Sequence, residues 1–332
     1  MNTATPPAGG LARTVLLYWL LLPGVAVAES AADLVQRAVE AGRVLDYDGV
    51  FVYQRDSSLD AMRLIHRGSG GSAGERERLV SLSGPAREVV RDGSRVTCTF
   101  ADDREVMVEK RPPRDLLGFG LSRSAASLAE EYEFRRADPD RIAGRQTHVV
   151  QILPRTLDRY GYTLWIDQAS GLLLKSVVFD HDGRPLEQVQ FAQVTIGGPI
   201  GDELLQPEVN GVDFTWYTNE TTPVGDPGDA VAGDWQVGWL PPGFEILREQ
   251  TQRMVASEMP VRHFVYSDGL ASVSIFIEKL QTTTAPVQGY SSMGAVNAFS
   301  RVADNFQITV VGEVPQTTVR QIALAVANRR TE

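Results

Sequence analysis

The chain has 332 residues and carries 32 basic and 42 acidic side chains, a formal net charge of −10. This charge balance argues against a nucleic-acid-binding protein, because phosphate backbones are bound by basic surfaces. Hydrophobic residues make up 43% of the chain, which suits ordinary globular cores, and the length predicts two domains.

The first 28 residues have the three-part pattern of a secretory signal peptide. Arg13 precedes an apolar run over 14–22, and Ala26-Val27-Ala28 forms an A-x-A cleavage pattern. The run is far shorter than the ~20 residues that a membrane span needs, so a membrane anchor is the less favoured alternative. We therefore expect an exported chain beginning at residue 29.

The exported chain is predicted to begin with a helix. Ser30, with Asp33 three residues later, has the pattern of a capping box. An apolar stripe follows at helical spacing and consists of Leu34, Ala38, Ala41 and Leu45. Tyr47-Asp48-Gly49 then ends the helical pattern.

From residue 50 to about 196 the sequence predicts strands joined by short turns. Asp92-Gly93, Ser170-Gly171 and Asp182-Gly183 each separate two β-rich runs, and such pairs supply the positive φ angles of tight hairpins. Local pairing of this kind predicts an antiparallel, up-and-down sheet rather than βαβ units. Within 186–196 the apolar alternation slips once, which indicates a β-bulge.

The segment 75–114 is dense in both arginine and acidic residues. Aligned arginines on a strand could hold phosphate groups. Cross-strand ion pairing on a solvated sheet face explains both residue types without a ligand, and we favour it. The glycine-rich run 68–74 just before it lacks the Lys-Ser/Thr of a phosphate loop and is interpreted as a hairpin tip.

An insert at 111–121 interrupts the strands and is followed by a short helical pattern over 124–132. It sets four apolar residues in a Pro/Gly frame, namely Leu116, Leu117, Phe119 and Leu121. The insert could be a lid over a concave sheet that binds lipid, or an ordinary connection that completes the core. The sequence leaves these two alternatives open.

Composition places the second domain after a linker. Residues 219–234 are rich in Gly, Pro and Asp, which is typical of a linker. We therefore predict a signal peptide at 1–28, an N-terminal domain at 29–218, and a C-terminal domain at 235–332. The C-terminal domain is predicted to hold strands near 244–254, 261–267, 271–278 and 308–311, and a final helix capped by Thr317 or Thr318.

Aromatic and apolar residues open the C-terminal domain: Trp235, Trp239, Leu240 and Phe244. Aromatic side chains after a linker can pack two domains together or bind a partner polypeptide. We expect these residues to form a partner or interdomain surface.

No catalytic motif of the sequence stands in the context that its chemistry needs. The four histidines, His66, His148, His181 and His263, lie far apart with no metal-ligand spacing, so no metal site is predicted. The pattern G-x-S-x-G occurs once, at residues 70–74, but it lies within the run interpreted as a hairpin tip and not at the strand-to-helix turn that a hydrolase nucleophile needs. The single cysteine, Cys98, lies in a strand pattern and is expected to be a buried thiol rather than a nucleophile or an intermolecular bridge. The residues themselves therefore favour a binding protein over an enzyme, with no cofactor.

Five segments, spread in order over the chain, carry a family resemblance. They are Tyr47–Tyr53, Trp239–Phe244, Tyr266–Glu278, Gly294–Ser300 and Val310–Pro315. In these segments the chain resembles the MucB/RseB family of periplasmic regulators of the bacterial envelope-stress sigma factor.

The resemblance implies an α+β, mostly antiparallel fold. Its N-terminal domain would be an unclosed β-barrel like that of the lipoprotein carrier LolA, with helices in the concave face. Its C-terminal domain would be a small antiparallel sheet with a helix.

The resemblance also implies a function. A periplasmic protein of this family binds the periplasmic region of a membrane anti-sigma factor of the RseA or MucA type and protects it from regulated proteolysis. Lipopolysaccharide or the acyl chains of mislocalised lipoprotein would release it. A lipoprotein carrier and a secreted hydrolase stay as alternatives, and a homo-oligomer stays open.

Overall fold

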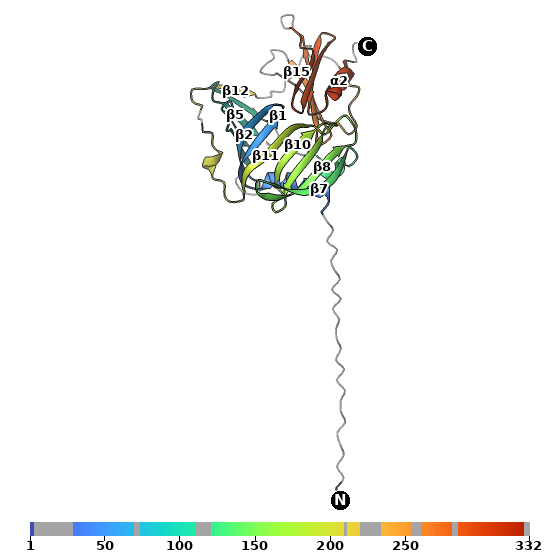
Figure 1. Ribbon diagram of the computed structural model, residues 1–332. Helices are drawn as coiled ribbons and strands as arrows, with labels where there is room; N and C mark the ends of the chain where they lie inside the picture. Colours follow the sequence, from blue (N-terminus) through green and yellow to red (C-terminus); the bar gives the residue numbers. More distant parts are fainter. Residues whose placement is uncertain are drawn as a thin grey trace.

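The computed structural model describes residues 1–2, 29–69, 74–110, 121, 123–208, 211–219, 234–253, 260–280 and 285–328. The predicted signal peptide from residue 3 to 28, the insert from 111 to 120 and most of the predicted linker lie outside these residues. Figure 1 shows the described parts as a large curved sheet, coloured blue to yellow, with a smaller sheet in orange and red beside one of its rims.

The first element is the predicted helix, α1, which covers Ala31–Val44. The capping box is confirmed, because the Ser30 side chain accepts from the Asp33 backbone N–H and the Asp33 side chain accepts from the Ser30 N–H. Such a cap satisfies N–H groups that have no partner within the helix. Leu34 and Val35 are fully buried on the inner side of the helix.

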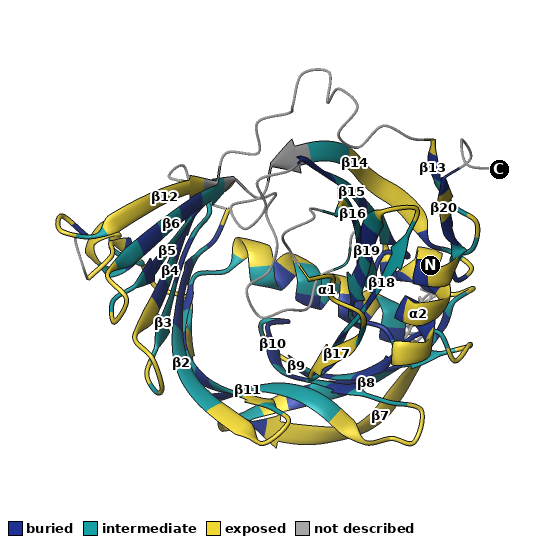
Figure 2. Ribbon diagram, turned by 90° about the horizontal axis from the view of Figure 1, so that it is seen from above, coloured by how far each residue is buried: buried dark blue, intermediate teal, exposed yellow. Residues whose placement is uncertain are grey.

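The larger sheet has twelve strands among the described residues, in the order β12-β6-β5-β4-β3-β2-β1-β11-β10-β9-β8-β7. In chain order the strands are β1 (Tyr47–Arg55), β2 (Ser58–Arg67), β3 (Arg76–Ser81), β4 (Arg87–Asp92), β5 (Arg95–Phe100), β6 (Glu105–Lys110), β7 (Tyr132–Ile142), β8 (Arg145–Pro154), β9 (Gly161–Asp167), β10 (Leu173–Phe179), β11 (Pro185–Ile196) and β12 (Thr215–Asn219). Neighbouring strands pair antiparallel as predicted, except that β12 lies parallel to β6 at one edge. Figure 2 shows that the sheet curves around α1.

One pair of neighbouring strands in this sheet joins residues that are far apart in the sequence. β1 pairs with β11, from Tyr47 opposite Ile196 to Arg55 opposite Glu187. The pairing shifts by one residue between Val50 and Phe51, whose partners are Gln193 and Phe191. The predicted bulge is therefore confirmed, with Ala192 as the extra residue.

The concave face of strands β7–β10 is covered by α1. Leu34 and Val35 pack against a cluster that includes Ile152, Leu164 and Ile166. Burying an aliphatic side chain of this kind contributes roughly 1.5–3 kcal/mol. Ala125–Leu128, a short 3-10 helix (η1), adds Leu128 to the same cluster. The short helical pattern expected over 124–132 is thus present as a 3-10 helix, but it is shorter than predicted because the chain enters β7 at Tyr132.

The ion pairs expected in the arginine-rich segment are present, but the face is not solvated. Arg78 pairs with Glu88, and Arg91 pairs with Glu77. All four side chains are buried. The segment around the short 3-10 helix η2 (Asp202–Leu205) lies over the Arg78–Glu88 pair, since Arg78 donates to the Leu204 carbonyl. Glu77 and Arg91 lie on the opposite face of the sheet, beside the buried His66. The expectation of a solvated face is wrong because the return segment covers one pair and the other is buried on the far face.

The smaller sheet has six strands in the order β14-β15-β16-β19-β18-β17, and β13 pairs with β20 beside it. The strands are β13 (Trp235–Val237), β14 (Glu245–Arg253), β15 (Pro260–Ser267), β16 (Ser272–Lys279), β17 (Gly289–Met293), β18 (Val296–Ala303), β19 (Phe306–Gly312) and β20 (Val326–Asn328). Helix α2 (Gln316–Ala325) packs on it through Val319, Ile322 and Ala323.

Two finer predictions are wrong. The N-cap of α2 is Pro315 rather than Thr317 or Thr318, because the buried Thr318 hydroxyl instead donates to the Asp158 carbonyl of the larger domain. Cys98 lies on β5 as expected, but it is half-buried rather than buried. Within the described ranges, no helix is both long and apolar enough to cross a membrane.

Candidate functional site

The most distinctive polar region of the described structure lies where the two sheets meet. On the larger domain it is formed by the loop between β8 and β9, together with the start of β7. On the smaller domain it is formed by the turn between β15 and β16 and by the segments that begin β14, β18 and α2. Figure 1 shows the smaller sheet standing on the rim where β8 and β10 end.

A buried ion pair joins the domains at this boundary. Arg159 Nε lies 2.7 Å from Asp268 Oδ2, and the two side chains are 1% and 0% exposed. Unpaired charges at such depth would be very costly, because they lose their hydration. Each of these side chains therefore needs the other as its counter-charge, and the pair links the two domains.

Both partners of this pair have further hydrogen bonds. Asp268 Oδ2 also accepts from the Tyr132 hydroxyl at 2.9 Å, and Oδ1 accepts from the backbone N–H groups of Leu270 and Ala271, both at 2.9 Å. Arg159 donates to the Thr156 hydroxyl and to the Pro242 carbonyl of the smaller domain. The carboxylate thus receives four donors, two of them from the larger domain.

Aromatic rings enclose the Arg159 guanidinium. Its central carbon lies 5.8 Å from the Tyr132 ring centroid and 5.3 Å from that of Phe244. A guanidinium near ring faces is stabilised by cation–π attraction, more so away from water. The boundary is therefore closed to solvent by one ring from each domain.

A second set of hydrogen bonds runs along the same boundary. The Asn297 side-chain amide donates to the Tyr160 hydroxyl at 2.9 Å and to the Val314 carbonyl at 2.8 Å. The Tyr162 hydroxyl donates to Glu313 at 3.3 Å. Burial, together with the Glu313 charge, raises the pKa of Tyr162 well above its usual value, so the phenol stays protonated as the donor.

A third contact lies at the other end of the boundary. Glu187 on β11 accepts the Ala295 N–H at 2.9 Å, and Asp56 accepts the Gly294 N–H at 3.1 Å. The Tyr53 hydroxyl donates to the other Glu187 oxygen at 3.0 Å. Two carboxylates of the larger domain thus bind consecutive backbone amides of the smaller domain.

The boundary brings together the segments that carried the family resemblance. Trp239–Phe244 supplies the Pro242 carbonyl and the Phe244 ring, and Tyr266–Glu278 supplies Asp268. Gly294–Ser300 supplies Asn297, and Val310–Pro315 supplies Glu313. Sequence reasoning missed Arg159 and the role of Asp268, because their partners lie more than 100 residues away along the chain.

The predicted partner or interdomain residues occupy different environments. Trp235 is buried in the core of the smaller domain, where its ring meets Phe306 at 5.0 Å. Phe244 is buried too, but it faces Arg159 across the boundary. Trp239 and Leu240 are half-buried against the same core.

Most of the predicted lipid pocket lies outside the described residues. This holds for Leu116, Leu117 and Phe119. Leu121 is described, and it packs half-buried against the cluster that contains α1 and β8–β10. That cluster also includes Leu270 and Ala295 of the smaller domain, so the concave face and the domain boundary are in direct contact.

The boundary has the chemistry of a joint rather than of a reaction centre. Arg159 and Asp268 are paired, and burial raises the pKa values of Tyr132 and Tyr162 well above their usual value, so these two phenols are protonated. Such a joint can couple two binding events, because a ligand that prefers one arrangement of the domains alters the affinity for a second ligand.

Comparison with known proteins gives matches to two family models. The MucB/RseB N-terminal domain matches residues 30–209, and the MucB/RseB C-terminal domain matches residues 229–327. Among curated proteins, the sigma factor AlgU regulatory protein MucB of Pseudomonas aeruginosa is 32% identical over 95% of this chain and 97% of its own length. The sigma-E factor regulatory protein RseB of Haemophilus influenzae is 28% identical over 95% of this chain and 98% of its own.

The solved structures include a similar chain with its partner. The structure of the Pseudomonas aeruginosa MucA/MucB complex contains a chain that is 32% identical, with a TM-score of 0.70. The match covers 90% of this chain and 98% of that one. A crystal structure of MucB gives a TM-score of 0.63 at 31% identity, over 89% and 97% of the two chains.

Proposed function

The chain belongs to the MucB/RseB family, and from this premise we propose that it is a periplasmic regulatory binding protein for a membrane anti-sigma factor. It binds the periplasmic region of an RseA- or MucA-like protein and protects that region from regulated proteolysis. Lipopolysaccharide or mislocalised lipoprotein releases it. The related curated proteins are named as sigma-factor regulators, which supports a regulatory rather than an enzymatic role.

One observation carries the proposal. The chain matches, over 90% of its length, a MucB chain that was solved together with MucA. The match spans both domains, so the whole two-domain frame on which that complex is built is available in this chain.

The two-domain frame supports a linkage mechanism. The concave face of the larger domain contacts Leu270 and Ala295 of the smaller domain, so a ligand that enters this face acts directly on the boundary. If an acyl chain and the anti-sigma polypeptide favour different domain arrangements, each weakens the binding of the other by the same factor. Release on lipid binding then needs no chemical step.

A direct binding experiment tests the proposal. The labelled periplasmic domain of Pseudomonas aeruginosa MucA is titrated with the purified chain, and its fluorescence anisotropy is followed with and without lipopolysaccharide. Saturable binding that lipopolysaccharide weakens supports the whole proposal. Binding that lipopolysaccharide leaves unchanged removes the lipid-release part, and lack of saturable binding overturns partner recognition. Transfer of lipidated protein to an acceptor would instead favour a lipoprotein carrier.

The lipid pocket is proposed to include Leu116, Leu117, Phe119 and Leu121. A Leu117→Asp, Phe119→Asp double variant places two charges among these apolar residues and is expected to reduce the effect of lipopolysaccharide at least about tenfold, since burying a charge is costly. Leu59→Asp is the matched control, because Leu59 is an exposed leucine on β2. Equal lipopolysaccharide responses in the two variants would contradict the assignment.

The partner surface is proposed to include Trp239 and Leu240, with Trp235 and Phe244 supporting it from the core beneath. Trp239→Ala is expected to weaken MucA binding about tenfold or more, because tryptophans often dominate interface energies. Trp216→Ala is the control, since Trp216 is half exposed on the distant edge strand β12. Unchanged MucA affinity in a folded Trp239→Ala variant would exclude this surface.

A further inference from the structure

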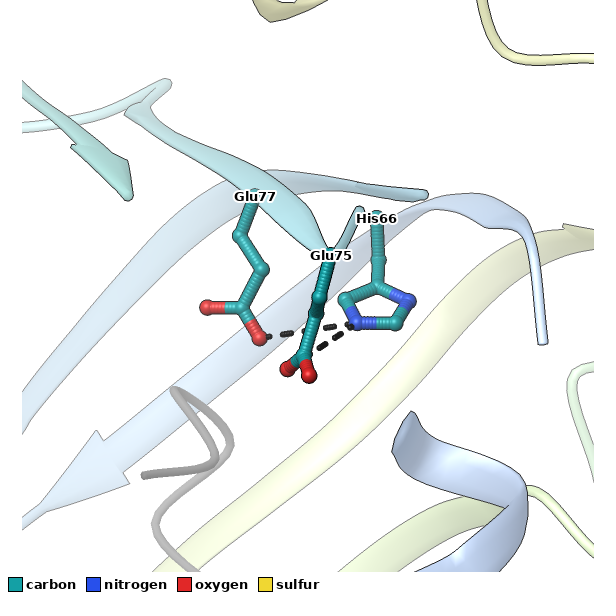
Figure 3. Close-up of side chains that lie close together, drawn as sticks. All are labelled: His66, Glu75 and Glu77. Carbon is teal, nitrogen blue, oxygen red and sulfur yellow. Dashed lines mark ion pairs between the residues drawn. The ribbon is translucent and has the colours of Figure 1, made fainter. Parts of the chain in front are cut away.

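A second cluster of ionisable side chains lies inside the larger domain, away from the domain boundary. It contains His66 near the end of β2, and Glu75 and Glu77 at the start of β3 (Figure 3). His66 Nε2 lies 3.8 Å from Glu75 Oε1 and 3.7 Å from Glu77 Oε1. One ligand atom from each residue lies within 4.8 Å of the others, and both carboxylates face the same imidazole nitrogen.

The imidazole of His66 is fixed in one orientation. Its Nδ1 lies 2.8 Å from the Leu45 carbonyl, which can only accept, so Nδ1 carries the hydrogen. The Tyr47 ring stacks on the imidazole with the centroids 4.7 Å apart. His66 is completely buried, and its Nε2 has no hydrogen-bond partner among the described residues. A lone pair at Nε2 therefore points at two carboxylates.

This arrangement lacks a positive charge at its centre. The lone pair and both carboxylates are electron-rich, and groups of this kind repel one another in a buried site. Arg91 pairs with Glu77 through Oε2 at 3.2 Å, whereas the Glu77 oxygen that lies near the imidazole is Oε1. Either a proton on Nε2 or a metal ion supplies the missing charge. The convergence of three donor atoms within 4.8 Å of one another favours the metal ion.

We propose that His66, Glu75 and Glu77 form a binding site for a divalent transition-metal ion of the Zn²⁺ type. His66 Nε2 and one oxygen of each glutamate are the protein ligands, and water completes the coordination. A donor set of one imidazole and two carboxylates suits Zn²⁺ and its neighbours in the first transition row.

The distances fit this ion after a small contraction. Ligand atoms at about 2.1 Å from a tetrahedral ion lie roughly 3.4 Å apart. The present nitrogen–oxygen separations exceed this by a few tenths of an ångström, which the flexible glutamate side chains can supply. The Leu45 carbonyl on Nδ1 and Arg91 on Glu77 are the outer partners that orient metal ligands in established sites.

The site would tie together elements that are distant from the domain boundary. His66 on β2 lies directly opposite Glu77 on β3, and Glu75 directly precedes β3. The outer partner of His66 is Leu45, the C-cap residue of α1. Bound metal would therefore fix β2, the start of β3 and the C-terminal end of α1 relative to one another. No residue spacing in the sequence points to this site, because the ligands are brought together by strand register rather than by one local motif.

Metal titration of the purified, tag-free chain tests the proposal. The chain is stripped with a chelator and titrated with ZnCl₂ by calorimetry, and with Co²⁺ by visible absorption, which reports tetrahedral coordination. One equivalent of Zn²⁺ is expected to bind. Glu75→Gln is expected to weaken its affinity about tenfold or more, and His66→Asn is expected to do at least as much.

Two features keep the test decisive. Glu75 is partly exposed, so Glu75→Gln is expected to fold even if His66→Asn does not, and circular dichroism checks this. His181→Asn is the control, because His181 lies on the surface turn after β10, and its Zn²⁺ affinity is expected to match that of the parent chain. The proposal is overturned if the parent chain shows no saturable Zn²⁺ binding, or if folded Glu75→Gln binds Zn²⁺ as the parent chain does.

Discussion

Two networks of buried ion pairs, one inside the larger sheet and one between the domains, neutralise a buried arginine in different ways. Inside the sheet, Arg78 is held by Glu88, by Glu208 at 2.9 Å and by the Leu204 carbonyl. Between the domains, Arg159 has Asp268 as its carboxylate partner. Arg78 thus has two carboxylate partners, whereas Arg159 has one, with the Thr156 hydroxyl and the Pro242 carbonyl as neutral acceptors.

The two main ion pairs differ in how far their formation depends on the tertiary structure. Arg78 and Glu88 lie ten residues apart on neighbouring strands, so local hairpin formation is enough to bring them together. Arg159 and Asp268 lie 109 residues apart in separate domains, so they meet only when the domains are docked. The interdomain pair is therefore suited to report on domain arrangement, whereas the Arg78–Glu88 pair forms with the hairpin, and only its further partners Leu204 and Glu208 come from a distant segment.

The largest effect is expected for Asp268→Asn. The substitution leaves the Arg159 guanidinium buried without a counter-charge, and removing one partner of a buried pair costs about 3–5 kcal/mol. Urea unfolding of the full chain would measure the loss in the free energy of unfolding, and limited proteolysis would show whether the domains separate.

The control for this variant is Asp182→Asn. Asp182 pairs with Arg184 at 3.8 Å on the surface, and exposed pairs contribute about 0–1 kcal/mol. If Asp268→Asn unfolds at the same urea concentration as Asp182→Asn, the interdomain pair does not hold the domains together.

A smaller effect is expected when the smaller domain is acidified. His263 on β15 stacks on Phe276 at 4.3 Å, and neither ring nitrogen has a hydrogen-bond partner among the described residues. Burial, with a lesser contribution from Arg248, lowers the pKa of His263 to about 4. In the unfolded chain its pKa is about 6.5.

Because the unfolded chain binds this proton more readily, the contribution of His263 to stability is full above pH 6.5 and is lost as the pH falls towards 4. The expected loss is about 1–2 kcal/mol after allowance for partial exposure. Urea unfolding at pH 7 and at pH 4.5 would measure it. In His263→Phe this part of the pH dependence should vanish, and an unchanged pH dependence would contradict the assignment.

Gly294→Ala tests the third interdomain contact. Gly294 has a φ of 60°, and an added Cβ would fall on the Glu187 carboxylate and the Arg55 side chain of the larger domain. Gly183 has a φ of 78° and open space around it, so Gly183→Ala carries the backbone cost of about 1 kcal/mol alone. We expect Gly294→Ala to be destabilised by about 1 kcal/mol more in urea unfolding, through the weakened contact. Equal losses in the free energy of unfolding would show that the added methyl group does not weaken this interdomain contact.

The smallest effect is expected for Glu208→Gln in the sheet network. Glu208 is 75% exposed, and Arg78 keeps Glu88 as its partner after the substitution. The expected loss is below about 1 kcal/mol in the same urea assay. A loss as large as that of Asp268→Asn would show that Arg78 depends on Glu208 as strongly as Arg159 depends on Asp268, although Arg78 keeps a second carboxylate partner.

Local features of the fold were predictable from the sequence. The Ser30–Asp33 cap, the hairpin at Asp92-Gly93 and the bulge in β11 each depend on residues within a short stretch of chain. The family could also be recognised, because its segments keep their order along the chain. Two of the predictions that were wrong share a cause: the solvated face over Arg78 and the threonine cap of α2 were both altered by a distant segment that packs against them.

The sequence by itself determined the α+β class, the antiparallel strands and the family, because alternation, turn pairs and caps act over a few residues. Only the tertiary structure decided that Asp268 faces Arg159 and that His66 faces Glu75 and Glu77. The partner of a charged side chain cannot be predicted from a periodic pattern in the sequence. Their pairing follows from strand register and domain docking, which place residues distant in sequence within a few ångströms and away from water.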